Sequence, residues 1–133
     1  MAGIDIILDS LSHDLERVEK RLFESIETEV ELLNAVCRHI LESGGKRIRP
    51  LVMLLSSRLC GYTGHENIDL ACVLEFIHTA TLLHDDVIDH AEIRRGSSSA
   101  NTIWGNHATI LSGDFLFAKA FVMAVEKSNL RVL

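Results

Sequence analysis

Apolar residues in the first third of the chain recur every three or four positions, with charged residues between them. This spacing places side chains on one face of an α-helix, so it predicts amphipathic helices. The first apolar stripe consists of Leu11, Leu15, Val18, Leu22 and Ile26. Thr28-Glu-Val-Glu31 has the form of a capping box, which predicts that a second helix begins there. Ser43-Gly44-Gly45 is suited to end that helix, because glycine readily adopts the left-handed conformation of a C-cap.

The same periodicity continues towards the C-terminal region. We expect one domain over residues 1–133, with helices at about 5–26, 28–43, 50–60, 68–90 and 107–127. Asn67 or Asp69 is suited to cap the fourth helix, and Asn106 the last one. The 133 residues include a single proline and only 5% aromatic residues, so the pattern predicts an all-α fold.

Composition narrows the class of protein. A formal net charge of −6 gives no reason to expect nucleic acid or an anionic membrane as a partner. Cys37, Cys60 and Cys72 are odd in number and lack C-x-x-C spacing, so they are expected to be reduced core thiols. Asp5 and Asp9 stand where a signal peptide needs positive charge, and no apolar run approaches the length of a membrane span. We therefore expect a soluble, cytoplasmic protein.

Three carboxylates follow an apolar segment that reads as a core helix. Asp85 and Asp89 fall on one face of that helix, one turn apart, with Asp86 beside them. Their mutual repulsion, and the helix dipole in a last turn, both oppose this arrangement. A solvated helix end is the simpler interpretation, but the buried segment before it favours a function. Hard carboxylate oxygens in a row suit Mg²⁺, which takes its other ligands from water and substrate phosphates.

A second charged cluster lies between two predicted helices. Lys46, Arg47 and Arg49 follow two glycines and precede Pro50, at the start of a helix. Free backbone N–H groups at a helix N-terminus favour an anion, whereas three cations there repel one another. The segment differs from a Walker loop, and a solvated basic turn is the alternative. The crowding of positive charge favours an anion site.

Residues on either side of the acids extend the candidate site. Arg94 and Arg95 begin five residues after Asp89, close enough to bind the same polyanion as the metal. His78 lies seven residues before Asp85, on nearly the same face, although a lone histidine there is usually a core residue. The small residues Ala80 and Thr81 would leave open space beneath the carboxylates.

Other polar positions carry weaker signals. Residues 97–101 form a polar segment that we expect to be a mobile lid beside the arginines. Asp114 lies on an apolar core face and is expected to have an arginine or lysine as its partner. Arg38 and His39 are expected to be surface residues.

The motifs together resemble a known family. They match trans-isoprenyl diphosphate synthases in order and spacing, and the long-chain polyprenyl, octaprenyl-type members most closely. The matching segments are Gly44 to Pro50, Glu75-x-x-His78, Leu83 to Asp89, Arg94-Arg95-Gly96 and Gly113-Asp114-Phe115-Leu116. The resemblance implies an all-α isoprenoid-synthase-type bundle around a central cavity, usually a homodimer. It also implies Mg²⁺-dependent condensation of isopentenyl diphosphate with an allylic diphosphate into a trans-polyprenyl diphosphate.

The resemblance assigns roles to individual residues. It implies that Asp85, Asp86 and Asp89 bind Mg²⁺ on the allylic diphosphate, which Arg94 also holds, and that these four residues are catalytic. It implies that isopentenyl diphosphate is bound by Lys46, Arg49, His78 and Arg95.

A further carried-over role concerns product length. In the family a large side chain at the fifth residue before the first aspartate stops the growing tail. Here that residue is Ala80, followed by Thr81, which predicts a long product.

The sequence departs from the family in length. Family chains are over twice as long and carry a second aspartate-rich motif and a lysine that contacts the allylic diphosphate, both absent from these 133 residues. Ser98 also stands where the family usually has proline. We therefore expect the N-terminal half of a synthase with an incomplete bundle. Alone it is expected to have weak activity or none, and an apolar face on its last helix that drives oligomerisation.

Two rival interpretations come from other classes. In an HD-type metal phosphohydrolase a His-Asp pair binds a transition metal, and His84-Asp85 with His39 and Asp114 would be the ligands. This interpretation gives the basic segment and the arginine pair no role. The second rival is a non-catalytic regulatory subunit of a heteromeric prenyl synthase, which would not need its three metal acids.

Overall fold

The computed structural model describes residues 2–127 and 131. The chain folds into helices joined by short loops, with one small β-hairpin near the end of the fourth helix. The elements are α1 (Ala2–Ser25), α2 (Glu31–Glu42), α3 (Ile48–Leu59), α4 (Glu66–Ile88), β1 (Ile93–Arg94), β2 (Ser97–Ser98) and α5 (Ala100–Lys127). The all-α prediction is confirmed.

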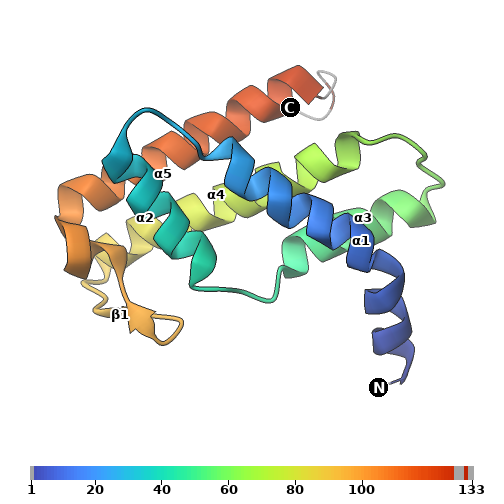
Figure 1. Cartoon of the computed structure of the whole chain (residues 1–133), viewed down its shortest axis with the longest axis horizontal. Coiled ribbons are helices and arrows are strands. Elements are labelled where there is room, and N and C mark those ends of the chain that lie inside the picture. Colours follow the sequence, from blue (N-terminus) through green and yellow to red (C-terminus); the bar gives the residue numbers. More distant parts are fainter. Residues whose placement is uncertain (1, 128–130, 132–133) are drawn as a thin grey trace.

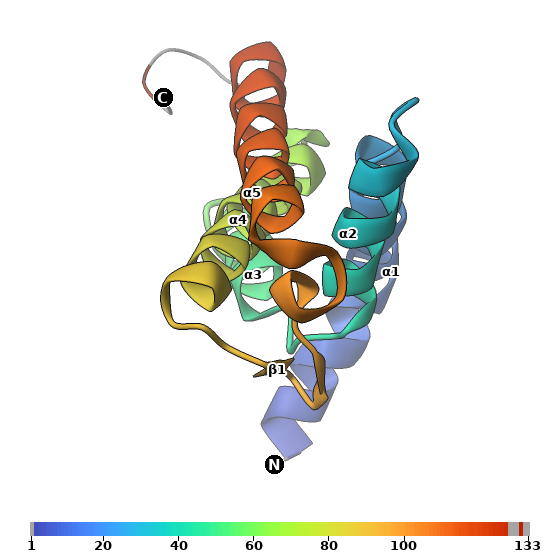
Figure 2. The same ribbon diagram turned by 90° about the vertical axis from the view of Figure 1, so that its left-hand side faces the viewer.

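Helices α4 and α5 form the long axis of the molecule and pack against each other more extensively than any other pair (Figure 1). Helix α3 packs on α4, α1 packs on α3 and α4, and α2 packs on α5. Seen along the axis, α1 and α2 lie on one side of the molecule, and α4 and α5 on the other (Figure 2). The β1–β2 hairpin lies at one end, below the start of α5.

The core is formed by the apolar stripes that the periodicity predicts. Leu11, Val18 and Leu22 of α1, and Ile26 directly after it, are fully buried, and they belong to one cluster with Phe76 and Leu83 of α4 and Leu54 of α3. Each such side chain contributes about 1.5–3 kcal/mol when it is removed from water. This burial is what fixes α4, and with it the residues at the end of α4.

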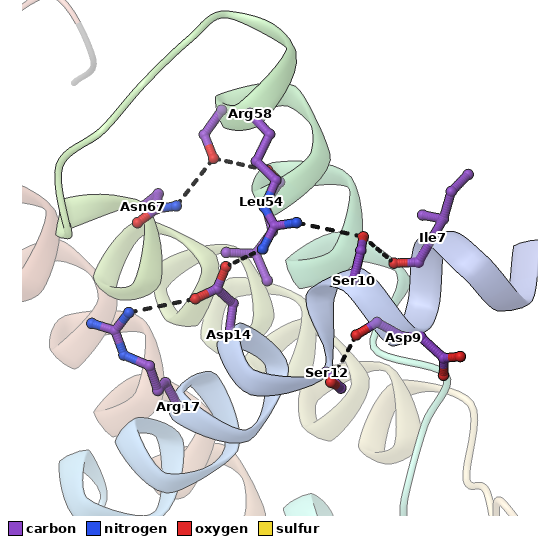
Figure 3. Close-up of polar contacts among 10 residues, drawn as sticks. Ile7, Asp9, Ser10, Ser12, Asp14, Arg17, Leu54, Arg58 and Asn67 are labelled. Carbon is purple, nitrogen blue, oxygen red and sulfur yellow. Dashed lines mark hydrogen bonds and ion pairs between the residues drawn. The ribbon is translucent and has the colours of Figure 1, made fainter.

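Polar contacts join α1 to its neighbours at the rim of this core. Asp14 of α1 accepts a hydrogen bond from Arg58 Nη2 of α3 at 2.9 Å and lies 3.4 Å from Arg17 Nη1 (Figure 3). Arg21 Nε donates to Asp69 of α4 at 2.7 Å. Exposed pairs of this kind add little stability, roughly 0–1 kcal/mol each, but they fix the position of α1 along α3 and α4.

Two predicted caps are wrong. Helix α2 begins at Glu31 and not at residue 28, and its N-cap is Val30, which makes no side-chain cap. Thr28 instead exchanges hydrogen bonds with Asn34, whose Oδ1 accepts from the Thr28 N–H and whose Nδ2 donates to the Thr28 carbonyl. The Asn34 side chain therefore provides hydrogen-bond partners for the backbone of the loop before the helix.

Helix α4 also starts differently from the prediction. Its N-cap is His65, again without a side-chain cap, and the helix begins at Glu66. Asn67 and Asp69 lie inside the first turn, where they bond to Ser57 and Arg21. Both candidate caps are thus used for contacts between helices.

Helix α5 begins at Ala100, seven residues before the predicted start. Gly105 (φ 83°, ψ 166°) breaks it into two helical pieces, and the second piece coincides with the predicted last helix. The side chain of Ala100 is fully buried. The short first piece therefore packs on the core, which the isolated sequence pattern did not indicate.

The cysteine prediction is confirmed for two of three residues. Cys37 and Cys72 are buried free thiols, and burial raises the pKa of each to about 12. Cys60 is exposed at the end of α3, so its prediction as a core thiol is wrong.

Helix α5 also bears on the membrane question. The sequence predicted no membrane span, but α5 is long and apolar enough to cross a membrane by length and composition. Core helices of soluble proteins pass the same test, and part of α5 is buried against α4 and α2.

Candidate active site

The three acids at the end of α4 differ in their surroundings. Asp85 and Asp89 are exposed, and Asp89 is the C-cap, its N–H donating to the Asp85 carbonyl at 2.8 Å. Asp86 is fully buried. It continues the inward stripe of Phe76 and Leu83, because residue 86 lies three positions after residue 83 on the helix. The motif therefore presents two carboxylates to solvent and one to the interior.

Arg94 of β1 is the partner of Asp86. Its Nε donates to Asp86 Oδ1 at 3.0 Å, and its Nη2 makes a second, closer contact with the same oxygen. This hydrogen bond raises the pKa of Arg94 despite partial burial, and the charges of Asp85 and Asp89 act in the same direction. Arg94 is thus locked beside the exposed acids.

The hairpin that carries the two arginines has a tight two-residue turn. Ile93 pairs with Ser98 and Arg94 with Ser97, leaving Arg95 (φ 53°) and Gly96 (φ 81°) between them. Positive φ at both positions is the pattern of a type I′ turn, which favours asparagine or glycine at the first position. An arginine in this conformation is uncommon, and it directs Arg95 away from the acids and back towards α2 and α3.

Arg95 completes a basic pocket of about 450 Å³ between the α2–α3 loop and α4. Its guanidinium packs on Gly45, where any Cβ would lie 2.8 Å from Arg95 Nη1. Lys46, Arg49 and His78 also line the pocket. Glycine at position 45 is therefore needed for the close approach of the arginine.

The electrostatics of this pocket favour an anion. Burial, together with the charges of Arg47, Arg94 and Arg49, lowers the pKa of Arg95, and Glu75 only partly opposes this. Burial and the nearby arginines, Arg49 first, likewise lower the pKa of His78. Both shifts mean that positive charge is destabilised by the surroundings of this pocket. A bound polyanion would reverse them.

Arg47 lies within the basic segment, but its guanidinium is bonded to residues of three helices. Its Nε and Nη2 contact Glu19 of α1, its Nη1 donates to Glu75 of α4 at 3.1 Å, and its Nη2 donates to the Leu41 carbonyl at 3.1 Å. Burial acts to lower its pKa, but Glu19 and Glu75 outweigh it and raise the pKa. Arg47 therefore ties α1, α2 and α4 together below the pocket.

The acid end has the donor chemistry of a divalent-cation site. Within residues 2–127 and 131, no three His, Cys, Asp or Glu side chains converge in a ready-made metal site. Asp85 and Asp89 nevertheless offer exposed hard oxygens one turn apart, and Asp86 Oδ2 is buried without a partner among these residues. Since Mg²⁺ binds through one or two carboxylates and completes its shell with water and phosphate, Asp85 and Asp89 fit it.

The two predicted chain-length residues face in different directions. Ala80 is buried at 1% exposure, whereas Thr81 is exposed and its hydroxyl donates to the His78 carbonyl at 2.7 Å. An apolar cavity of about 280 Å³ lies further along the same helix, between Leu70, Leu74 and Ile77 of α4 and Phe121 of α5. The roles of Ala80 and Thr81 stay predictions.

His84 connects the acid end to α5. Its Nε2 lies 3.1 Å from the Ile110 carbonyl and 3.3 Å from Asp114 Oδ1, and its ring packs on Gly113. Asp114 therefore has a histidine as its neighbour, and its carboxylate is exposed, in contrast to the predicted arginine or lysine on a core face. A Cβ at residue 113 would lie 2.4 Å from His84 Nε2, so glycine is required for this packing.

His39 was expected to be a surface residue, but it makes contacts with the hairpin and with α5. It is half-buried, its Nε2 lies 2.8 Å from the Ser98 carbonyl, and its ring meets Trp104 edge-on at 5.1 Å. The ligand set of an HD-type hydrolase is not assembled among the described residues: His84 lies beside Asp114, but His39 is bonded to the hairpin and no three His, Cys, Asp or Glu side chains converge. Residues 97–101 lie in β2 and at the start of α5 rather than in an irregular loop, and Ser99 and Asn101 both donate to the Ala91 carbonyl; the role of this segment as a lid stays a prediction.

Comparison with known proteins is consistent across sequence and structure. Residues 30–133 match the family model for polyprenyl synthetase. The chain is 41% identical over 131 residues to octaprenyl diphosphate synthase of Escherichia coli (strain K12), covering 98% of this chain and 41% of that protein. It is also 41% identical over 128 residues to all-trans-nonaprenyl-diphosphate synthase (geranyl-diphosphate specific) of Rhodobacter capsulatus, covering 96% of this chain and 39% of that protein.

Solved structures agree with this assignment. A decaprenyl diphosphate synthase from Rhodobacter capsulatus superposes with a TM-score of 0.91 at 42% identity, over 96% of this chain and 40% of that one. A polyprenyl synthase from Caulobacter crescentus CB15, complexed with calcium and isoprenyl diphosphate, gives 0.92 at 39% identity, over 96% and 39%. The chain thus spans about 40% of the length of these relatives, and it belongs to the polyprenyl synthetase family.

Proposed function

We propose that this chain forms the diphosphate-binding part of a trans-polyprenyl diphosphate synthase, which joins isopentenyl diphosphate to an allylic diphosphate. One observation carries the proposal: a single hairpin connects two charged sites. Arg94 is bonded to Asp86 beside the exposed acids, and Arg95 lines the basic pocket. Two adjacent diphosphate sites of different character are what a reaction between two diphosphates requires.

In this proposal each site receives one substrate. Isopentenyl diphosphate occupies the basic pocket, where Lys46, Arg49, His78 and Arg95 bind its diphosphate through charge-assisted hydrogen bonds. The allylic diphosphate lies over Asp85 and Asp89, with Arg94 beside it, and Asp86 holds Arg94 in place. Magnesium bound by Asp85 and Asp89 would neutralise charge on the allylic diphosphate and on its departing form.

The chain's own residues support the following bond changes. The allylic C–O bond breaks with both electrons going to the departing diphosphate, whose charge Arg94 stabilises. The double bond of isopentenyl diphosphate attacks the allylic carbocation and forms the new C–C bond. A proton is then lost to the released diphosphate, which restores a double bond. Lys46, Arg49 and Arg95 hold isopentenyl diphosphate in place during the attack.

The product, assembly and location complete the proposal. The small residues Ala80 and Thr81 leave room for a long prenyl tail, and the apolar cavity further along α4 extends that path. Exposed apolar side chains of α5, including Leu111, Val122 and Val125, support assembly into a homodimer or higher oligomer. Three unpaired thiols support a reducing, cytoplasmic location.

The test is incorporation of labelled isopentenyl diphosphate by the purified chain with farnesyl diphosphate and Mg²⁺, with products separated by length. The chain alone is expected to bind both diphosphates with weak turnover or none, and any long-chain product should be lost in Asp85→Ala and kept in Glu92→Gln, an exposed acid outside the motif. Magnesium-dependent binding of both diphosphates without turnover would confine the proposal to substrate binding. Failure of the chain to bind either diphosphate would contradict the proposal.

A further inference from the structure

His39 contacts the second strand of the hairpin that carries Arg94 and Arg95. It lies on α2, and its Nε2 is 2.8 Å from the carbonyl oxygen of Ser98 in β2. Because a carbonyl only accepts hydrogen bonds, Nε2 carries the hydrogen and donates it. The same ring meets Trp104 at 5.1 Å with an interplanar angle of 74°, an edge-on arrangement that aromatic rings favour. The imidazole is thereby fixed at two points.

The other backbone attachments to the helical body lie at the base of the hairpin: the Ala91 N–H donates to the Asp86 carbonyl, and Asn101 Nδ2 of α5 donates to the Ala91 carbonyl, both at 2.9 Å. The Ser99 N–H donates to the Glu92 carbonyl at 2.9 Å and its hydroxyl donates to the Ala91 carbonyl, so these bonds close the base of the hairpin on itself. Arg94 bonds to Asp86 of α4. In the part of the chain that the structure describes, the bond from His39 is the hydrogen bond that ties β2 to α2.

The two arginines need such an attachment. The turn holds Arg95 at a positive φ of 53°, which is unfavourable for a residue with a side chain. It also holds Arg95 near Arg47, Arg49 and Arg94, whose charges repel it. Without an anion, both effects favour movement of the hairpin towards solvent. A fixed point on β2 opposes that movement.

We propose that His39 is a positioning residue: through the Ser98 carbonyl it holds the β1–β2 hairpin so that Arg94 and Arg95 are preorganised for diphosphate. The proposal rests on the proposed function, in that these arginines bind a diphosphate. It requires that the hydrogen bond, and not the bulk of the ring, carries the effect.

Two substitutions separate the hydrogen bond from the ring. His39→Phe keeps an aromatic edge for Trp104 and loses the donor, whereas His39→Gln keeps a donor that reaches a carbonyl. His65→Phe is the matched control, because His65 is exposed at the N-cap of α4, about 30 Å from the acids by helical rise. The probe is inorganic pyrophosphate, titrated into the 133-residue chain by calorimetry and by the fluorescence of Trp104, its single tryptophan.

We expect His39→Phe to weaken pyrophosphate binding by roughly fivefold to tenfold, because the variant lacks the one hydrogen bond that holds the hairpin in its binding position. His39→Gln is expected to recover most of that loss, and His65→Phe to bind as the wild type does. Equal binding by His39→Phe and the wild type, with Arg94→Gln weakened, would overturn the proposal and leave the proposed function standing. Equal weakening in the Phe and Gln variants would also overturn it.

Hydrogen exchange provides a readout that needs no ligand. We expect His39→Phe to raise the exchange rates of the amides in residues 93–99 while the core of α4 stays protected. If the wild type binds no pyrophosphate, the anion part of the proposed function fails, and this measurement alone decides the present proposal. Unchanged exchange across residues 93–99 would then overturn it.

Discussion

The acid end of α4 and the basic α2–α3 loop are built on the same plan with opposite charge. In each, one charged side chain is turned inward and bonded, and its neighbours are left exposed. Asp86 is fully buried against Arg94, whereas Asp85 and Asp89 are free for a cation. Arg47 is bonded to Glu19 and Glu75, whereas Lys46 and Arg49 are exposed. In each motif one residue, Asp86 or Arg47, is bonded to the rest of the structure and is called the anchor here, while its charged neighbours are exposed.

The two anchors differ in how much depends on them. Arg47 joins three helices and neutralises Glu75, whose side chain is only 3% exposed. Asp86 joins one helix end to a hairpin, and Arg94 remains 30% exposed, so water can replace part of the lost interaction. The comparison teaches that the basic loop's anchor supports the fold, while the acid end's anchor supports the site.

The largest expected effect comes from removing the basic anchor. Arg47→Met leaves Glu75 buried and unpaired, which is expected to reduce the free energy of unfolding by about 3–5 kcal/mol. The control is Arg38→Met, since Arg38 is exposed and its pair with Glu42 is long at 3.9 Å, so less than about 1 kcal/mol is expected. Urea denaturation measures both.

A double variant sharpens this prediction. Adding Glu75→Met to Arg47→Met removes the unpaired charge and should restore much of the lost stability, because the penalty belongs to the buried carboxylate. Similar losses in Arg47→Met and Arg38→Met would show that the division into anchors and exposed neighbours is wrong.

Removal of the acid anchor should have a smaller effect on stability. Asp86→Asn weakens the hydrogen bonds from Arg94, and about 1.5–3 kcal/mol is expected from the loss of a bond to a charged group. Pyrophosphate binding should weaken as well, because Arg94 loses its fixed position. The same two measurements on Asp85→Asn serve as the comparison. If Asp86→Asn were as stable as Asp85→Asn, burial would not distinguish the two acids.

Substitution of an exposed acid should weaken metal binding without reducing stability. Asp85→Asn is expected to leave stability unchanged or slightly higher, because it removes an anion from the last turn of a helix. It should weaken Mg²⁺ binding by about tenfold, or roughly 1.4 kcal/mol. Calorimetric titration of Mg²⁺ in the presence of pyrophosphate is the measurement, and Glu92→Gln should bind as the wild type does.

The smallest expected effect is a dependence on pH at His78. Its pKa in the folded chain lies below the usual 6.5, so neutral His78 favours folding above pH 6.5, and this contribution is lost as the pH falls through the lowered pKa. A polyanion in the pocket raises the pKa again, so binding takes up a proton. Between pH 7.5 and 5.5, pyrophosphate affinity of the wild type should rise about threefold relative to His78→Gln. Parallel profiles would place His78 outside the anion site.

The sequence predicts the helices and the chemistry better than the connections. The stripe from Leu11 to Leu22 is predictable, because a 24-residue helix buries a repeating face. The burial of Asp86 was also readable, since Phe76, Leu83 and Asp86 continue one stripe. The helical periodicity therefore predicts that Asp86 is buried while Asp85 and Asp89 are exposed, whereas the spacing of the aspartates alone does not.

The hairpin and its attachment could not be predicted in this way. Each strand has two residues, too few for an alternation of apolar and polar side chains to be recognised. Arg95 occupies the turn position where asparagine would usually indicate a hairpin. The contact of His39 with Ser98 joins residues 59 positions apart. Neither residue type is unusual locally, so only the packing of α2 beside α5 brings them together.

The type I′ turn at Arg95 and Gly96 also bears on any attempt to engineer this chain. Substitution of Arg95 by asparagine or glycine suits the positive φ better and should raise thermal stability. A screen that selects only for thermal stability or for statistical turn preference would therefore favour loss of the arginine. If Arg95 binds diphosphate as proposed, thermostabilised libraries of this chain need to hold position 95 fixed, because the residue best for stability there differs from the residue needed for binding.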